Sequence, residues 1–230
     1  MKFPTLSSFF KCWSADQFSR GSPKQAILIV DPYSNSHYLT KSMSDFIENN
    51  KLGIDLIATD NLHVSANIRK ALDYSSYSKV YTYTPEGKIK AYAKELLKRI
   101  RSDGYKIVQV VVGAESGVLL ADYLSESLGR ITNGTKLSKA RRSKFHMHEA
   151  LKEKHLRSCN QFLAYSLADA IKAAEQIGYP VIAKPESAAG TEGVSKCMNA
   201  QDLTDAWERV TNVKNMQGLE NKSLLVQEFV

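Results

Sequence analysis

A lysine that ends an apolar strand and opens a loop of small residues has the clearest chemical meaning in this sequence. Val181, Ile182 and Ala183 precede Lys184, and residues 185–193 read PESAAGTEG. An unpaired ammonium is costly to desolvate, so Lys184 needs an anionic partner or a route to solvent. A loop with two hydroxyls, two glycines and otherwise small side chains lets backbone N–H groups approach phosphate oxygens. The stretch therefore predicts a polyphosphate site.

Two known phosphate-binding patterns do not fit, and a plainer interpretation stays open. A Walker A loop places its lysine after the glycines, whereas Lys184 comes before them, and no GxGxxG follows the apolar runs that end at Val30 and Val112. Nicotinamide or flavin binding is therefore not supported. The stretch around Lys184 is equally typical of a β-hairpin whose strand ends in a surface lysine. Similarly, the glycines of GAESG at 113–117 could serve only to let a strand pack closely against its helix.

A basic segment over 135–157 contains three histidines, His146, His148 and His155. Residues two apart on a helix point to different sides, and His148-Glu149 lacks the second histidine of HExxH, which argues against a metal site. Eight lysines and arginines in this segment are typical of a solvated helix face. Nucleic-acid binding is an alternative that rests on charge alone.

Composition indicates a globular protein with a modest basic excess. The 230 residues are 43% hydrophobic, and 31 basic residues against 24 acidic ones leave a net charge of +7. This balance is weak support for a nucleic-acid partner. Cys12, Cys159 and Cys197 form no CxxC, which favours a reducing, cytoplasmic location. No apolar run approaches the roughly 18 residues of a membrane span, so no membrane partner is expected, and residues 1–24 are interpreted as a loosely ordered leader.

Apolar strands alternate with helical patterns in the first half of the chain. Strands are expected near 25–30, 54–59, 79–83 and 105–112, with helices near 39–47, 64–72, 85–101 and 118–128. This order predicts an α/β fold with a doubly wound parallel sheet over 25–130. Ligands of such sheets bind where strands end, which is where GAESG lies.

The turn-rich run 128–134 marks a predicted domain boundary, and the pattern then changes. Ser166 is the expected N-cap of a helix that ends at Gly178. The strand that carries Lys184 should pair with a second strand over 194–198. A helix over 202–211 and a last strand over 223–230 follow.

Four segments taken in order resemble the ATP-grasp superfamily, specifically its carboxylate–amine ligases, which include amino-acid and dipeptide ligases. They are GAESGVLLADYLSESLG, NGTKLSKARRSKFHMHEAL, GYPVIAKPESAAGTEGV and LLVQEF. The resemblance implies a pre-ATP-grasp domain over 25–130. It also implies that 131–230 is the first part of an α+β ATP-grasp module.

The resemblance assigns nucleotide-binding roles residue by residue. Lys144 matches the family's first nucleotide-binding lysine, and Lys184 matches the second, which contacts phosphates. The loop that closes over the phosphates includes Ser187, Gly190, Thr191 and Gly193. Gln227, Glu228 and Val230 match the hinge strand that reads the adenine edge, where the family commonly has glutamate at the position of Gln227.

The implied activity is ATP-dependent activation of a carboxylate. ATP would phosphorylate the carboxylate, and an amine would attack the acyl phosphate, with lysines and Mg²⁺ stabilising the transferred phosphoryl group. The expected partners are ATP and small carboxylate and amine substrates, with a homo-oligomer possible. The family's magnesium-binding carboxylates and catalytic arginine lie beyond the hinge strand, so a truncated chain without the catalytic metal site is expected. The alternative is a non-catalytic nucleotide-binding or regulatory protein.

The expected truncation carries a structural corollary. The residues beyond the hinge strand would be the ones that pair with it, so Leu224, Leu225, Val226 and Phe229 are expected on an unfinished sheet. That sheet would have an open edge and an exposed apolar face.

Overall fold

The computed structural model describes residues 22–33, 36–84, 89–186, 193–211, 213 and 221–230. In the first half, the elements are β1 (Lys24–Val30), α2 (Ser36–Asn49), β2 (Asp55–Asn61), α3 (Ala66–Arg69), η1 (Tyr74–Ser76), β3 (Lys79–Tyr83), α4 (Ile89–Ser102), β4 (Tyr105–Val112), η2 (Glu115–Gly117) and α5 (Val118–Ser127). The helix expected over 64–72 is only the single turn of α3. The predicted leader lies almost wholly outside the described residues.

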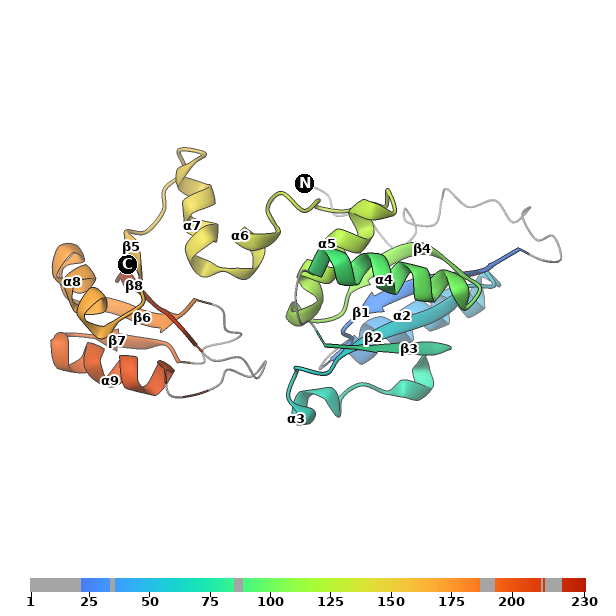
Figure 1. Ribbon diagram of the computed structural model, residues 1–230, viewed down its shortest axis with the longest axis horizontal. Coiled ribbons are helices and arrows are strands. Elements are labelled where there is room, and N and C mark those ends of the chain that lie inside the picture. The colour runs from blue at the N-terminus through green and yellow to red at the C-terminus, as the bar shows by residue number, and fades with distance from the viewer. Residues whose placement is uncertain (1–21, 34–35, 85–88, 187–192, 212, 214–220) are drawn as a thin grey trace.

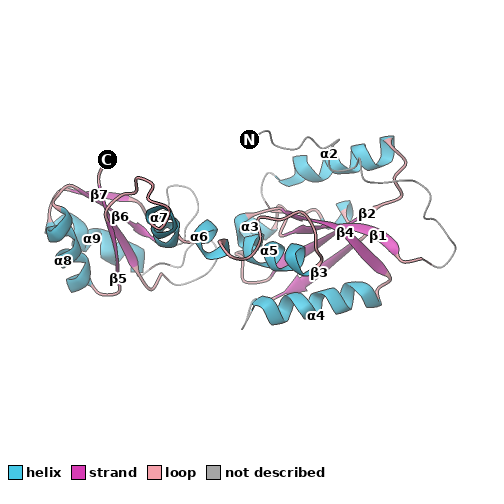
Figure 2. Ribbon diagram, turned by 90° about the horizontal axis from the view of Figure 1, so that it is seen from above, coloured by secondary structure: helices cyan, strands magenta, loops and turns pink. Residues whose placement is uncertain are grey.

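The first sheet is parallel, with the strand order β3-β2-β1-β4. Side chains of β1 alternate between its two faces, as the period of a strand requires. Ala26, Leu28 and Val30 join the core beneath α4 and α5, whereas Ile27 and Ile29 pack against α2. Figure 2 shows α2 and α4 on opposite faces of the sheet. The predicted doubly wound architecture is confirmed.

The glycines of the GAESG turn bring it close to the end of β1. A Cβ on Gly113 would lie 2.5 Å from the Cα of Pro32, and a Cβ on Gly117 would lie 2.8 Å from the carbonyl oxygen of Val30. Real Cβ atoms do not approach other atoms so closely. Both glycines therefore serve close packing, although the partner is the end of β1 and not the packing of β4 against its own helix that the sequence predicts.

The second half contains α6 (Ser138–Arg142), α7 (Lys144–Lys152), β5 (Gln161–Ala164), α8 (Leu167–Ile177), β6 (Val181–Pro185), β7 (Ser195–Cys197), α9 (Ala200–Thr211) and β8 (Leu224–Glu228). The side chain of Ser166 accepts a hydrogen bond from the N–H of Asp169, and Gly178 ends α8 at φ +90°. Both predicted helix signals are confirmed. Within the described ranges, no helix is long and apolar enough to cross a membrane.

The second sheet has the strand order β5-β8-β6-β7, and all of its pairs are antiparallel. The expectation that the last strand forms an open edge is wrong, because β8 lies between β5 and β6. Leu224, Leu225 and Val226 are fully buried, and only Phe229 is exposed. The first and third of these residues share a core with α8 and α9. An apolar face left open at β8 is therefore not observed either.

Ser143 links two short helices that contact different parts of the molecule. On α6, Arg141 lies 2.7 Å from Asp122 of α5, and Arg142 lies 3.0 Å from Glu115 in the GAESG turn. α7 instead packs beside β5, and Figure 1 shows α6 between the two sheets. Ser143 follows α6 in an extended conformation and caps α7 by accepting from the N–H of His146. The predicted domain boundary at 130/131 stays a prediction.

Candidate functional site

Lys184 and Gln227 lie on one face of the second sheet. In the β6–β8 register, Ile182 is opposite Gln227 and Lys184 is opposite Leu225. This places Lys184 and Gln227 as diagonal neighbours whose side chains can meet. The ammonium of Lys184 donates to Oε1 of Gln227, so this lysine contacts a neutral amide. Gln227 is only 6% exposed.

His148, on α7, contacts the other end of the Gln227 amide. Its Nε2 lies 3.3 Å from Nε2 of Gln227, and its Nδ1 lies 2.9 Å from Oγ of Ser158. The hydroxyl of Ser158 also donates to the carbonyl oxygen of His148, at 3.3 Å. A hydrogen-bonded chain therefore runs from the segment after α7, through His148 and Gln227, to Lys184.

Lys144 places a second ammonium near this face. It is the first residue of α7, and its N–H donates to the carbonyl oxygen of Glu186, just after β6, at 3.2 Å. Burial lowers the pKa of Lys184, and the charge of Lys144 lowers it further. Burial likewise lowers the pKa of Lys144, and Glu115 partly offsets this. Two partly desolvated ammonium groups that repel each other form a site that an anion would stabilise.

Glu186, the carboxylate nearest to Lys184 along the chain, already has hydroxyl partners. Ser143 donates to its Oε1 at 2.6 Å, and Ser223 donates to its Oε2 at 3.3 Å. His146 Nδ1 lies 3.5 Å from Oε1. His146 and His148 thus have separate partners, as the sequence predicts for residues two apart on a helix.

Three other predicted nucleotide-binding residues, Gly193, Glu228 and Val230, lie in the described part of the chain. Gly193 has φ +68°, and a Cβ there would lie 2.9 Å from the Pro185 side chain, so the turn after the loop requires glycine. Glu228, at the end of β8, accepts a hydrogen bond from Asn160 at 2.9 Å. Val230 is 82% exposed. The remaining three, Ser187, Gly190 and Thr191, lie outside the described residues.

The described residues do not offer magnesium a fitting set of ligands. Within them, no three His, Cys, Asp or Glu side chains are grouped as they would be around a metal ion. Mg²⁺ prefers oxygen ligands in octahedral geometry, usually carboxylates and phosphates. Lysines, an amide and a neutral imidazole do not meet that need, so we assign no step through magnesium to these side chains.

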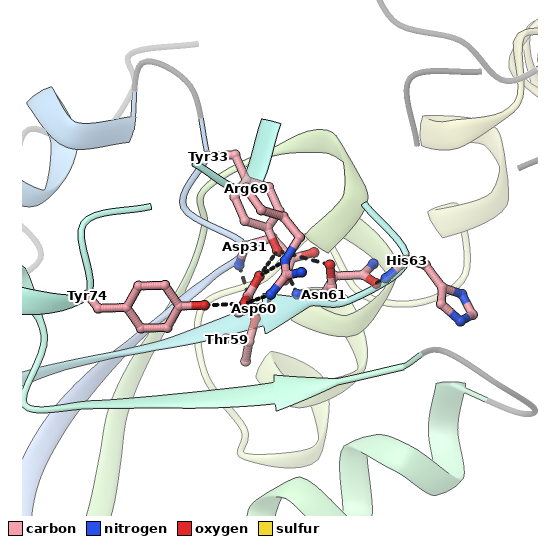
Figure 3. Close-up of polar contacts among 8 residues, drawn as sticks. All are labelled: Asp31, Tyr33, Thr59, Asp60, Asn61, His63, Arg69 and Tyr74. Atoms are coloured by element: carbon pink, nitrogen blue, oxygen red, sulfur yellow. Dashed lines mark hydrogen bonds and ion pairs between the residues drawn. The ribbon is translucent and has the colours of Figure 1, made fainter. Parts of the chain in front are cut away.

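A second polar cluster lies in the first sheet, where β1 and β2 end (Figure 3). Asp60 accepts from Nε of Arg69 at 2.7 Å and from the hydroxyl of Tyr33 at 2.8 Å. Tyr74 and a second Arg69 nitrogen donate to its other oxygen. Burial alone would raise the pKa of Asp60, but these hydrogen bonds outweigh it and lower the pKa. The cluster ties the segment containing α3 and η1 to the sheet.

Asp31, like Asp60, is a carboxyl with no exposed surface. Hydroxyls donate to it from Thr59 and Ser116 at 2.8 Å and from Tyr83 at 2.9 Å. Burial, the dominant effect, raises the pKa of Asp31 to about 6 despite these donors. The hydroxyl dipoles thus offset only part of the cost of burying the charge of Asp31.

Sequence reasoning treated Asp31 only as a strand terminator and did not single out Asp60. The available signal was positional, since both aspartates stand at the carboxyl ends of parallel strands, where ligands of such sheets bind. The sequence also gives no signal for the role of His148, because its partner Gln227 is 79 residues away.

The fold and the lysine-bearing sheet face agree with the predicted resemblance to the ATP-grasp class. The family model for the ATP-binding domain of the carbamoyl-phosphate synthase L chain matches residues 141–230. The predicted resemblance to ATP-grasp carboxylate–amine ligases is confirmed, and the chain is related to that group.

Individual relatives agree with this placement. Dapdiamide A synthase of Enterobacter agglomerans is 37% identical over 129 residues, which are 55% of this chain and 30% of that protein. The L-amino acid ligase of Bacillus licheniformis has a similar fold, with a TM-score of 0.60 at 15% identity over 91% of this chain and 45% of the other. N5-carboxyaminoimidazole synthetase of Staphylococcus aureus, solved with ADP, gives a TM-score of 0.56 at 15% identity, over 93% and 49% of the two chains. This chain thus spans less than half the length of each.

Proposed function

We propose that this chain carries the nucleotide-binding part of an ATP-dependent carboxylate–amine ligase. The observation that carries the proposal is the placement of Lys184 beside Gln227 on the face of β6 and β8, with Lys144 at the start of α7, whose charge lowers the pKa of Lys184. ATP phosphates are the anion that the resemblance assigns to these lysines. Glu228 and Val230 would lie along the adenine edge, and Ser187, Gly190, Thr191 and Gly193 would close over the phosphates.

The reaction we propose for the whole protein is transfer of the γ-phosphoryl group of ATP to a substrate carboxylate. The resulting acyl phosphate would be attacked by an amine, which forms a C–N bond and releases phosphate. Lys144 and Lys184 would bind and orient the phosphates and stabilise their charge. The family works with Mg²⁺, and we propose no ligands for it among the described residues. A reducing cytoplasmic location and a homo-oligomer stay predictions.

The binding part of the proposal is tested with two matched lysine variants. Lys184→Ala should weaken ATP binding about tenfold or more, because charge-assisted contacts contribute about 1.5–3 kcal/mol. Lys172→Ala is the control, since this lysine is exposed on α8. Calorimetric titrations with ATP and with AMP separate phosphate contacts from adenine contacts. Equal losses in the two variants would refute the assignment of Lys184.

A second candidate function is that of a non-catalytic nucleotide-binding or regulatory protein. The described side chains hold no group of metal ligands, but because the family's magnesium-binding carboxylates lie beyond the hinge strand, both functions agree with this observation. Phosphate release from ATP, measured on the whole protein with mixtures of amino acids, separates the two proposals. Ligation requires release that depends on both a carboxylate and an amine. ATP binding without any such release would favour the regulatory function.

A further inference from the structure

Four side chains from separate segments form one continuous hydrogen-bonded chain at the proposed nucleotide site. They are Ser158, which follows α7, His148 on α7, Gln227 on β8 and Lys184 on β6. The family commonly has glutamate at the position of Gln227. A glutamate side chain could accept hydrogen bonds with both oxygens, whereas the amide of Gln227 cannot. An amide has one acceptor end and one donor end, and the two cannot be exchanged without cost.

The chemistry of each group fixes the direction of every bond. A lysine ammonium only donates, so Oε1 of Gln227 must face Lys184, and its NH₂ group must face Nε2 of His148. That nitrogen must then accept, which leaves the ring proton on Nδ1, where it donates to Ser158. Ser158 donates its own proton to the carbonyl oxygen of His148. All the hydrogen bonds of this series can form together only when the imidazole of His148 is neutral with its proton on Nδ1.

The surrounding charges favour this neutral form. Burial lowers the pKa of His148, and the cations Lys184 on β6 and Lys152 on α7 lower it further. The carboxylate of Glu149, also on α7, opposes them. Glu149 is itself engaged, since Lys152 donates to it at 2.9 Å and Gln161 of β5 at 3.2 Å. Ser158 and Gln227 are neutral.

We propose that neutral His148 is a positioning residue of the nucleotide site, which holds the Gln227 amide with its oxygen toward Lys184. This inference rests on the proposed function, because the importance of Lys184 depends on phosphate binding there. Without His148, the amide is free to rotate and present its NH₂ group to the ammonium, which displaces Lys184. Protonation of His148 has the same consequence, since Nε2–H would then oppose the NH₂ group of Gln227.

The substitution Gln227→Glu isolates this role. Both oxygens of a carboxylate accept hydrogen bonds, so Lys184 finds an acceptor in either orientation and needs no residue to set it. His148 should therefore matter in the native chain and matter much less in the Gln227→Glu background, as a double-mutant cycle can measure. The carboxylate should also draw a proton onto the imidazole.

The first experiment observes the imidazole directly by ¹⁵N NMR and needs no nucleotide. In the native chain, His148 should show the Nδ1–H tautomer and titrate below its ordinary pKa of about 6.5. In Gln227→Glu, its pKa should rise. An Nε2–H tautomer in the native chain, or an unchanged pKa in Gln227→Glu, would overturn the proposal.

The second experiment measures ATP affinity near neutral pH for three His148 variants. His148→Ala should weaken binding about two- to tenfold, which is the contribution of one neutral hydrogen bond. His148→Gln should restore affinity, because its amide oxygen can replace the Nε2 acceptor, whereas the shorter His148→Asn should not. In the Gln227→Glu background, we expect His148→Ala to leave the affinity nearly unchanged.

The outcomes separate this inference from the proposed function. Equal losses for His148→Ala in both backgrounds, or no rescue by His148→Gln in a folded protein, would overturn the positioning role. A native chain that binds no ATP would refute the proposed function. In that case the NMR titration still decides whether His148 sets the orientation of Gln227.

Discussion

Replacing Asp31 with asparagine should change how the stability of the protein depends on pH. This carboxyl is completely buried and receives hydrogen bonds from three hydroxyl groups. Its pKa rises from 3.8 to about 6 on folding, mainly because burial disfavours the charged form. The folded state therefore binds a proton more tightly than the unfolded state does. The stabilising contribution is complete below about pH 3.8 and is lost as the pH rises through about 6.

The size of the effect follows from the two pKa values. A difference of about 2.2 units corresponds to roughly 3 kcal/mol over the whole range, at about 1.36 kcal/mol per unit. Between about pH 4.5 and pH 7.5 the change is about 2 kcal/mol. An asparagine side chain has no charge to desolvate. Relative to the native protein, the Asp31→Asn variant should therefore gain about 2 kcal/mol of unfolding free energy as the pH rises across that interval.

Urea unfolding at a series of pH values measures this difference, and the comparison with the native protein cancels the other titrating groups. Asp45→Asn is the control, because Asp45 is an exposed carboxylate on α2. A difference between Asp31→Asn and the native protein that does not change with pH would show that burial does not perturb Asp31 and would refute the reasoning.

Three further substitutions test individual contacts by urea unfolding. Ser166→Ala removes the N-cap of α8 and should cost about 1 kcal/mol; no loss would mean that the cap contributes nothing. Arg69→Met leaves the fully buried Asp60 side chain without its cation and should cost about 3 kcal/mol, with a loss below about 1 kcal/mol contradicting the prediction. Gly117→Ala places a Cβ 2.8 Å from Val30 and should cost about 1–3 kcal/mol, unless the turn can move away freely.

Local patterns predicted much of this fold. The strands β1 and β4 follow from their largely apolar runs, and α8 follows from its serine cap and its terminal glycine. These features depend on residues that are neighbours in the chain. Lys184 was predicted from its own strand and loop, and the structure places it beside Gln227, as the shared sheet requires.

Strand order and distant side-chain pairs were not predictable in the same way. The central position of β8 depends on which strands pair, and no local pattern encodes the pairing of Gln161 with Gln227, which lie far apart in the chain. The His148–Gln227 contact spans 79 residues. The ion pair between Asp60 and Arg69 spans only nine residues but depends on how the intervening loop returns to the sheet.

The central position of β8 also constrains the order in which the protein folds. The four strands of the first sheet are complete by Val112, so that sheet can form while the rest of the chain is still being synthesised. β5 cannot pair this early, because its partner strand β8 begins only at Leu224. Such long-range pairing requires closure of a long loop and is slow. On the ribosome, β5 must therefore wait for β8, whereas β6 can already pair with β7, and a chaperone that shields exposed strands would act on β5 during that interval.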